Sequence, residues 1–291
     1  LLVKLGSKIV AAMQSATEAP LNETNGIGNG HLLDNFTGAV TVSAESIQCS
    51  NHRSEEILIT RQTFESLCEF DTALLANTRG YLDSTPPADW YMSGAINSLT
   101  PEIGPIAGIA VTAKIDSSTP GGKPDMENYF DQVDRMRKMD LPLIWVVETV
   151  GSRPEHECVL GDGMAKMLHA AGCLGAVCES YCRDISGCKA VPFAVYGLGT
   201  IAHHEVMRFP EVDVPVAVGG ITINPGDIIH ADSEGVIRIS EEIAEPLIDK
   251  APDMRGFEQA VHAIFRRTDV DSTRCREELA KVLERYGFTT P

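Results

Sequence analysis

The pattern of apolar and polar positions divides the chain into an irregular beginning, an alternating core and a helical end. Residues 16–52 are rich in Asn, Gly, Thr and Ser, which is typical of loop or disorder, so residues 1–55 are predicted to be a flexible or helical extension. Residues 54–82 repeat apolar side chains at three- and four-residue steps, and this spacing predicts a helix. Residues 56–291 are therefore predicted to form the folded domain.

Short apolar runs and amphipathic segments then alternate. Residues 106–115, 141–150 and 174–180 are rich in β-branched and aliphatic side chains, which predicts buried strands. The segments between them, 125–139 and 162–172, have the spacing of amphipathic helices. This alternation predicts an α/β fold with a layered sheet core.

The rest of the chain is mostly β and then helical. A short strand, 192–197, is followed by a polar crossing over 200–213. Residues 214–240 contain the turn sequences N-P-G-D and D-S-E-G, which predicts a β-meander. Residues 241–287 are predicted to form a helical C-terminal tail.

Charge excludes one class of partner. The formal net charge is −17 over 291 residues, and a protein that neutralises phosphates needs a basic face, so nucleic acid is not expected as a partner. No apolar run has the length of a membrane span. The first fifteen residues lack the compact apolar centre of a signal peptide and are predicted to be a short helix. We expect a cytoplasmic protein, and an organellar destination stays open.

Four cysteines fall close together but at irregular spacings. They are Cys173, Cys178, Cys182 and Cys188, and Cys178 lies inside a predicted strand. Zinc and iron–sulfur sites usually show paired C-x2-C sequences in loops. We therefore predict reduced thiols in or near the core.

Candidate functional residues lie at two places next to the predicted sheet, one at the start of a helix and one after a strand. Gly161-Asp162-Gly163-Met164 opens a helix whose free N–H groups can hold a carboxylate. Arg183 and Asp184 directly follow a predicted strand; Arg offers a planar fork for a carboxylate, and Asp offers an oxygen ligand for a hard cation. Together they suit a 2-oxo acid chelated to a metal ion. The alternative is that Asp162 and Asp184 only cap their helices.

Three histidines are weaker candidates. His203 and His204 stand in the polar crossing, where a ligand role and a surface role are equally compatible with the sequence. His230 lies in a predicted strand, so we expect it to be packed or hydrogen-bonded rather than catalytic.

Several motifs in order resemble one known family. Residues 160–162 read LGD, residues 170–177 read AAGCLGAV, and the Arg-Asp pair places Asp184 twenty-two residues after Asp162. With the β-meander, this series resembles the RraA-like family over roughly residues 65–270. That family is named after the regulator of ribonuclease activity A and includes class II aldolases acting on 4-hydroxy-4-methyl-2-oxoglutarate.

The resemblance implies a fold and a site. The fold would be a swivelling β/β/α layered domain that assembles as a homotrimer or homohexamer. Asp184 would bind Mg²⁺ or Mn²⁺ directly, and Arg183 would contact the keto oxygen of the substrate. Asp162 and Glu258, the latter from a neighbouring subunit, would hold metal-bound water. The amides that would hold the pyruvate carboxylate belong to Gly161, Asp162, Gly163 and Met164.

The implied function is that of a metal-dependent carbon–carbon lyase. It would cleave a 2-oxo acid through a pyruvate enolate, by retro-aldol reaction, by oxaloacetate decarboxylation, or by both. Glu179-Ser180 stands where many members have Asp-Gly, which leaves the substrate open. The alternatives are a non-catalytic regulator that binds a protein such as a ribonuclease, and a related enolate-chemistry enzyme of a specialised pathway.

Overall fold

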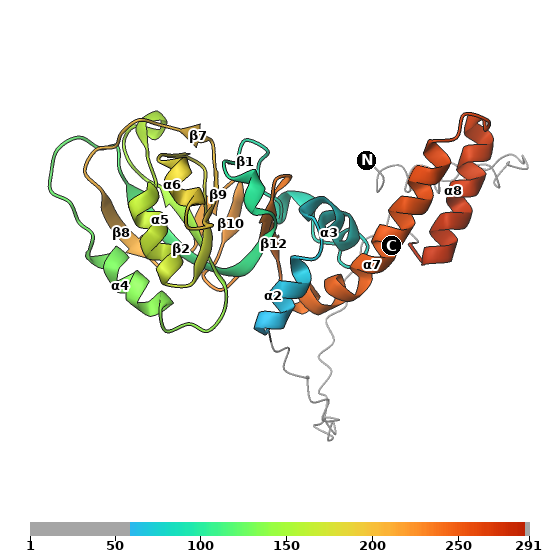
Figure 1. The fold of residues 1–291 in the computed structure, drawn as a ribbon, viewed down its shortest axis with the longest axis horizontal. Coiled ribbons are helices and arrows are strands. Elements are labelled where there is room, and N and C mark those ends of the chain that lie inside the picture. The colour runs from blue at the N-terminus through green and yellow to red at the C-terminus, as the bar shows by residue number, and fades with distance from the viewer. Residues whose placement is uncertain (1–58, 289–291) are drawn as a thin grey trace, which may run out of the picture.

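The centre of the fold is a sheet whose parallel strands are the apolar runs of the sequence. The computed structural model describes residues 59–288 (Figure 1). Strands β2 (Ile106–Asp116), β3 (Leu143–Thr149), β4 (Cys173–Cys178) and β6 (Ala194–Gly197) lie side by side in the order β6-β4-β3-β2, all parallel. The predicted core strands are thus confirmed.

Antiparallel strands complete this sheet at both ends. At one end β1 (Asn97–Ser98) pairs with β6. At the other, β11 (Ile228–Asp232) pairs with the first part of β2 and with β12 (Gly235–Ile239). The last part of β2 pairs instead with β8 (Arg208–Val212). Two further strands, β5 (Tyr181–Cys182) and β7 (Gly199–Thr200), form a small parallel pair.

Both faces of the central sheet are buried, which explains the continuous apolar runs. Along β3, Leu143, Trp145 and Val147 pack on one side, while Ile144 and Val146 pack on the other. The first side is covered by α4 (Glu127–Met136), α5 (Asp162–Ala170) and α6 (Ile185–Lys189). The second is covered by a separate β-ribbon, β9 (Val216–Val218) with β10 (Ile221–Ile223). The result is the β/β/α layering that the family resemblance implies.

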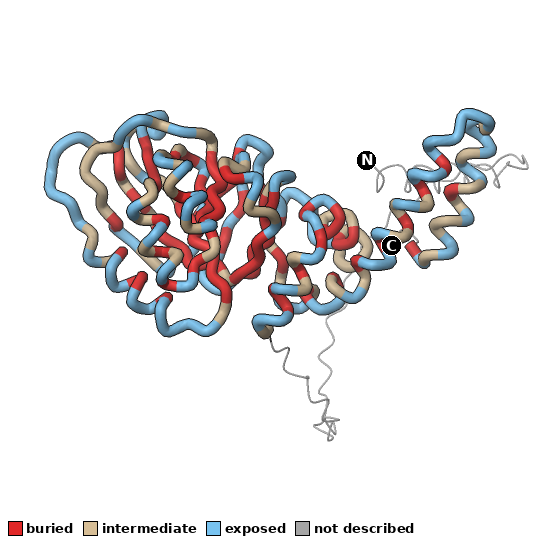
Figure 2. Tube along the Cα trace, in the orientation of Figure 1, coloured by how far each residue is buried: buried red, intermediate tan, exposed pale blue. Residues whose placement is uncertain are grey.

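Helices from the two ends of the described chain form a second apolar cluster. It joins α2 (Arg61–Leu67) and α3 (Thr72–Arg79) to α7 (Glu241–Phe265) and α8 (Ser272–Tyr286). Figure 2 shows buried positions recurring along α7, which then leaves the main body with α8 beside it. The helical C-terminal tail is confirmed, and the predicted extension over 1–55 lies outside the described residues. In the part of the chain that is described, no helix is long and apolar enough to cross a membrane.

Three sequence predictions need correction. The single helix over 54–82 is two helices within the described residues, because Asp71 accepts a bond from the Leu74 N–H at 2.8 Å and starts α3 anew. The polar crossing contains a strand, β8, whose alternation is hidden by Pro210 and Glu211. The β-meander is split, because β9 and β10 form their own ribbon while β11 and β12 join the main sheet.

The remaining short helices are η1 (Pro87–Asp89), η2 (Pro101–Ile103) and η3 (Pro154–His156).

Candidate functional site

The two candidate segments, residues 161–164 and residues 183–184, lie side by side in the structure. Their meeting point is called the corner below. The Val159 N–H donates to the Tyr181 carbonyl at 2.8 Å, and the Arg183 N–H donates to the Leu160 carbonyl at 3.0 Å. These bonds hold the two chain segments side by side just before each enters a helix. The amino ends of α5 and α6 therefore lie next to each other, and they bring Asp162 and Asp184 to one place.

Asp184 occupies the cap position of α6 without capping it. Its side chain makes no hydrogen bond to the helix, and its backbone is left-handed, with φ 55° and ψ 38°. This conformation is uncommon outside glycine, although Asp tolerates it better than most residues. One carboxylate oxygen, Oδ2, lies 3.3 Å from Arg183 Nε, and both side chains are partly exposed. Asp184 is thus placed to present its carboxylate to a ligand.

Two glycines permit the close approach of these segments. A Cβ atom at Gly161 would stand 2.8 Å from Asp184 Oδ2 and 3.2 Å from the Cγ of Arg183. A Cβ atom at Gly187 of α6 would stand 2.5 Å from the Cβ of Asp162. A larger residue at Gly161 would require the Asp184 or Arg183 side chain to shift, and one at Gly187 would require Asp162 to shift.

Asp162 is the first residue of α5 rather than its cap, which is Gly161. Its Oδ2 accepts a hydrogen bond from Lys166 Nζ at 2.6 Å. This bond lowers the pKa of Asp162 and raises the pKa of Lys166, so both stay charged. Lys166 was not among the residues predicted from the sequence, although its i,i+4 spacing from Asp162 on a predicted helix was the available signal.

The start of α5 also offers backbone donors. The first hydrogen bond of the helix runs from the Ala165 N–H to the Gly161 carbonyl at 3.1 Å. The N–H groups of Asp162, Gly163 and Met164 therefore have no carbonyl partner within the helix, although the Gly163 N–H faces the Asp162 carboxylate and helps to lower its pKa. The helix dipole adds partial positive charge at the same end. A carboxylate or other small anion is the ligand that such an end binds.

The oxygen donors fit one kind of metal ion better than others. Among the described residues, no group of three His, Cys, Asp or Glu side chains is close enough to hold a metal alone. Asp162 and Asp184 supply hard carboxylate oxygens only. Mg²⁺ is commonly bound by one or two carboxylates, with water and substrate completing its octahedron. The residues present therefore fit Mg²⁺ or the similar Mn²⁺, and they do not suit a structural zinc ion.

The structure places Glu258 apart from this corner. It lies on α7, and its Oε1 accepts a hydrogen bond from Asn77 Nδ2 at 2.8 Å. Figure 1 shows α7 beyond the β12 end of the sheet, away from α5 and α6. Within one chain Glu258 does not join Asp162 and Asp184, so its role stays a prediction about a second copy of the chain.

Glu179 and Ser180 are both engaged in hydrogen bonds with other parts of the chain. Glu179 Oε2 accepts a hydrogen bond from the Gly219 N–H at 3.0 Å, which ties the turn between β9 and β10 to the main sheet. Ser180 is buried, and its hydroxyl donates to the Glu157 carbonyl at 3.2 Å. The site is therefore not filled by these side chains.

The clustered cysteines are buried free thiols, as predicted. Burial raises the pKa of Cys173 to about 12 and that of Cys188 to about 11. Since the thiolate is the form that binds metals and attacks electrophiles, these side chains act as apolar packing at neutral pH.

The candidate histidines have different environments. His230 is buried, with Nδ1 3.0 Å from the Thr72 hydroxyl, so the expectation that it is packed is confirmed. His203 and His204 line a cavity together with Arg153, His156 and Glu205. Their ligand role is thus compatible with the structure.

Comparison with known proteins assigns the family. The sequence model described as "RraA-like: Aldolase/RraA" matches residues 87–238, just over half of the chain. The chain belongs to the RraA-like family. The matched segment includes the sheet, α5, α6 and all the candidate residues except Glu258.

Two relatives are similar to part of this chain, and one of them carries a functional name. A Halalkalibacterium halodurans protein named "Putative 4-hydroxy-4-methyl-2-oxoglutarate aldolase" is 32% identical over 103 residues, 35% of this chain and 49% of that protein. An uncharacterised protein of Methanocaldococcus jannaschii is 28% identical over 128 residues, 43% of this chain and 61% of its own length. The chain thus matches only about half to three fifths of the length of these relatives.

Solved structures support the fold. RraAS2 of Streptomyces coelicolor, described as an unusual member of the RNase ES inhibitor RraA protein family, superposes with a TM-score of 0.55 at 21% identity. That match covers 69% of this chain and 96% of RraAS2. An uncharacterised Pseudomonas syringae protein gives a TM-score of 0.57 at 22% identity, covering 75% and 94%.

Proposed function

We propose that the chain is a divalent-metal-dependent lyase that cleaves a carbon–carbon bond of a 2-oxo acid through a pyruvate enolate. The observation that carries the proposal is the meeting of Arg183, Asp184 and the amino end of α5 at one partly exposed corner. Membership of a family that includes an aldolase-named relative supports it.

The metal would be held mainly by Asp184. This carboxylate makes no capping bond and is tied only loosely to Arg183, so it is available for a cation. Asp162 is kept ionised by Lys166 and would hold water around the ion. A bound Mg²⁺ or Mn²⁺ supplies Lewis-acid polarisation of the 2-oxo acid.

The chain's own groups would bind and stabilise the reacting end of the substrate. The N–H groups of Asp162, Gly163 and Met164 are suited to the substrate carboxylate, and they need no rearrangement because α5 fixes them. The Arg183 guanidinium would face the keto oxygen, where negative charge develops as the carbon–carbon bond breaks. Because retro-aldol cleavage and decarboxylation develop the same charge, one site can perform both.

Pyruvate release from oxaloacetate tests the proposal. With Mg²⁺ the purified protein should release pyruvate faster than the metal alone, and chelation by EDTA should abolish the excess. Removing Arg183 in Arg183→Met should lower kcat by about 100-fold, the usual effect of losing one charge-stabilising donor. Asp131→Asn, an exposed carboxylate change on α4, is the matched control and should keep full activity.

The proposal fails if wild-type protein releases no pyruvate from oxaloacetate or from a 4-hydroxy-2-oxo acid. It also fails if Arg183→Met is as active as Asp131→Asn.

A second candidate function is the binding of a regulated protein partner. The formal net charge of −17 suits docking to a basic surface, and RraAS2 is described as belonging to an inhibitor family. A catalytically silent protein with full affinity for a basic partner would favour this candidate. Assembly as a homotrimer or homohexamer is part of both proposals.

A further inference from the structure

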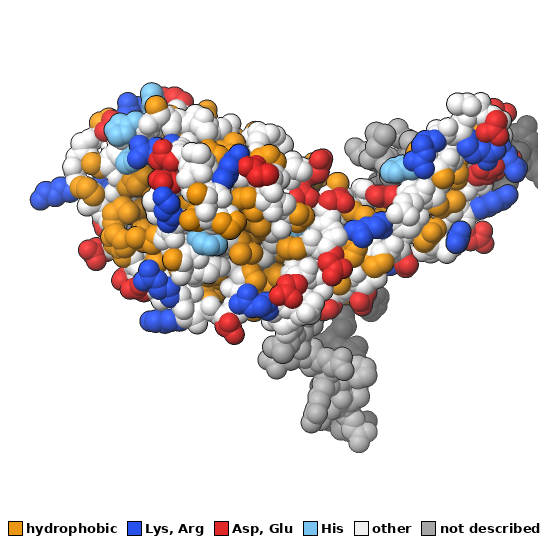
Figure 3. All heavy atoms as spheres, viewed as in Figure 1, with side chains coloured by type: hydrophobic (Ala, Val, Ile, Leu, Met, Phe, Trp, Pro, Cys, Tyr) orange, Lys and Arg blue, Asp and Glu red, His pale blue; other side chains and the backbone are white. Residues whose placement is uncertain are grey.

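A lysine stands beside the two carboxylates of the corner. Lys166 lies one turn after Asp162 on α5, and its Nζ is 2.6 Å from Asp162 Oδ2. The side chains of Lys166 and Asp162 are 51% and 37% exposed. Figure 3 shows basic and acidic side chains next to one another over the region of α5 and α6, so this face of the main body is open to solvent.

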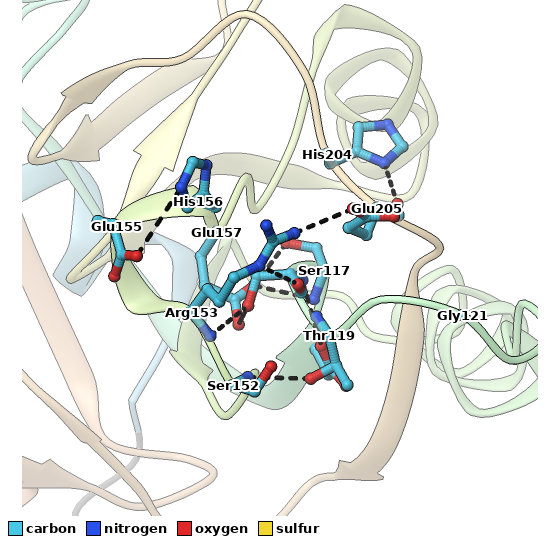
Figure 4. A network of polar contacts seen from close by, with 12 residues as sticks. Ser117, Thr119, Gly121, Ser152, Arg153, Glu155, His156, Glu157, His204 and Glu205 are labelled. Carbon is cyan, nitrogen blue, oxygen red and sulfur yellow. Dashed lines mark hydrogen bonds and ion pairs between the residues drawn. The ribbon is translucent and has the colours of Figure 1, made fainter.

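The backbone that leads into α5 is held in place by a buried network. Glu157 is fully buried, and its carboxylate accepts hydrogen bonds from the Ser117 N–H at 2.8 Å and the Ser117 hydroxyl at 2.6 Å (Figure 4). The Cys158 N–H donates to the same hydroxyl at 2.9 Å. Residues 157–160 are thus fixed to the end of β2. The direction of the Asp162 carboxylate therefore depends on its side chain rather than on movement of the backbone.

Two neighbours determine where the Asp162 side chain lies. A Cβ atom at Gly187 would stand 2.7 Å from Asp162 Oδ2, so α6 closes one side of the carboxylate. The Lys166 ammonium lies against the same oxygen on another side, and Asp162 is its one hydrogen-bond partner among the described residues. An exposed ion pair of this kind adds little to the stability of a fold. Its effect is therefore to be sought in the site.

The formal charges of the corner already balance. Asp162 and Asp184 carry two negative charges, while Lys166 and Arg183 carry two positive charges, and Arg183 Nε lies 3.3 Å from Asp184 Oδ2. The hydrogen bond to Asp162, and to a smaller extent the charge of Asp184, raises the pKa of Lys166, so the ammonium lies in the field of both carboxylates. Because the affinity of a site for a hard cation depends on the number of its charged oxygen ligands, Lys166 opposes metal binding.

We propose that Lys166 is a positioning residue that keeps Asp162 out of direct coordination to the divalent ion. The ammonium occupies the Asp162 carboxylate and repels a cation seated on Asp184. One direct protein ligand then remains, and the other coordination positions stay open for water and the 2-oxo acid. The ion pair thereby lowers the metal affinity of the corner and preserves room for the substrate. The inference rests on the proposed lyase function and specifies how the metal affinity of its site is set.

Mn²⁺ binding to the whole protein without substrate, followed by electron paramagnetic resonance, tests the inference. Lys166→Met removes the ammonium and keeps an unbranched side chain on an exposed helix position. It should tighten Mn²⁺ binding at least about tenfold, because a second carboxylate becomes available and a repelling charge is lost. Simple damage to the site would weaken binding, so the sign of the change distinguishes positioning from a structural role.

The number of water molecules on the bound Mn²⁺ gives a second measurement, obtained from the relaxation of water protons. Direct coordination by Asp162 takes a position that water holds in the wild-type protein. Lys166→Met should therefore have about one exchangeable water ligand fewer than wild type.

Two further variants separate the local ion pair from the general loss of charge. Lys166→Arg keeps a cation that can pair with Asp162 and should bind Mn²⁺ within about threefold of wild type. Lys189→Met is the matched control, since Lys189 Nζ lies 2.6 Å from Glu102 Oε1 in another exposed ion pair on the neighbouring helix. It removes the same charge from the protein and should also stay within about threefold. Circular dichroism confirms that each variant is folded.

The outcomes distinguish the inference from the proposed function. If wild-type protein binds Mn²⁺ and Lys166→Met binds it no more tightly, or with the same number of water ligands, the inference is overturned and the lyase proposal stands. The same holds if Lys166→Arg or Lys189→Met tightens binding as much as Lys166→Met. If wild-type protein binds no Mn²⁺, the lyase proposal fails and takes the inference with it.

Discussion

At the scale of single residues, the absence of a side chain at Gly161 is as important to the candidate site as the charged groups themselves. The Asp184 carboxylate lies where a Cβ atom at this position would come within 2.8 Å of it. A side chain at residue 161 would therefore force the Asp184 carboxylate to move from its present position beside the α5 amino end.

Gly161→Ala should lower Mg²⁺-dependent pyruvate release at least about tenfold, because it displaces the carboxylate that we propose binds the metal by a fraction of an ångström or more. The cost in stability should be only about 1 kcal/mol, the ordinary effect of an unfavourable residue at a helix cap. Steady-state kinetics and urea unfolding measure the two effects. Gly94→Ala, at a position with nothing within 4 Å of the added atom, is the control. Equal activity of both variants would show that the close approach is not needed.

His230 makes stability depend on pH. Burial lowers its pKa from 6.5 to about 4, and Nε2 has no hydrogen-bond partner in the described structure. The unfolded chain therefore binds a proton between pH 6.5 and 4 that the folded chain does not bind. The stability contributed by the neutral ring is present above pH 6.5 and is lost as the pH falls toward 4, by about 3 kcal/mol in total.

The pH dependence can be assigned by comparison with His230→Gln. Urea unfolding of both proteins at about pH 7.5, 5.5 and 4.5 should show a smaller decrease for the variant, although its stability at the highest pH is lower. Parallel pH profiles for the two proteins would contradict this account, since carboxylates common to both would then explain the whole decrease.

At the scale of elements, a buried glutamine connects α4 to the sheet. Gln132 Nε2 donates to the Thr112 carbonyl at 2.8 Å and to Asp213 Oδ1 at 2.7 Å, and its Oε1 accepts from Trp145 Nε1 at 3.0 Å. One side chain thereby joins α4 to β2, to β3 and to the segment that leads into β9. These bonds help to hold α4 over the sheet, beside the apolar contacts of Tyr129, Val133 and Met136.

Gln132→Met should destabilise the fold by roughly 3 kcal/mol, because it leaves the Trp145 N–H and the Thr112 carbonyl with fewer partners in the interior. Chemical denaturation measures the change, and Asp131→Asn on the exposed side of the same helix should shift stability by less than about 0.5 kcal/mol. Similar values for the two variants would mean that water replaces the lost bonds.

The sequence predicts an element correctly when its apolar pattern is strong. It does not predict an element that is defined by hydrogen-bond pairing with another strand. The runs that became β2, β3 and β4 are apolar on both faces, so buried strands in a layered sheet core were the simplest interpretation. The partner of β8 could not be predicted, because a short strand with two polar positions is defined by its register against β2. Likewise the motifs named Asp162 and Asp184, but only the fold showed Lys166 bonded to the first and neither carboxylate acting as a helix cap.

At the scale of the whole molecule, α7 and α8 extend from the body and carry Glu258 away from the corner that it is predicted to complete. A site shared between two chains, as we propose, would resolve this separation. Homotrimers or homohexamers of the chain, detectable by light scattering, are the assemblies in which α7 of one copy would reach α5 and α6 of the next.

Mixing two inactive variants tests a shared site. Asp184→Asn and Glu258→Gln should each lose most activity alone, and the amide oxygen introduced by the second change can still accept the hydrogen bond from Asn77. After exchange of subunits under mildly dissociating conditions, some sites would combine an intact Asp184 with an intact Glu258, so about a quarter of wild-type activity should return. Failure of the mixture to recover any activity after exchange would argue for a site within one chain.

The most direct measurement of the central claim is the binding of Mn²⁺, a paramagnetic substitute for Mg²⁺, followed by electron paramagnetic resonance. Wild-type protein and Asp131→Asn should each bind one ion per site, and Asp184→Asn should bind at least about 100-fold more weakly, because it loses the one direct carboxylate ligand. Equal binding by Asp184→Asn and wild-type protein, or no binding by wild-type protein, would contradict the account.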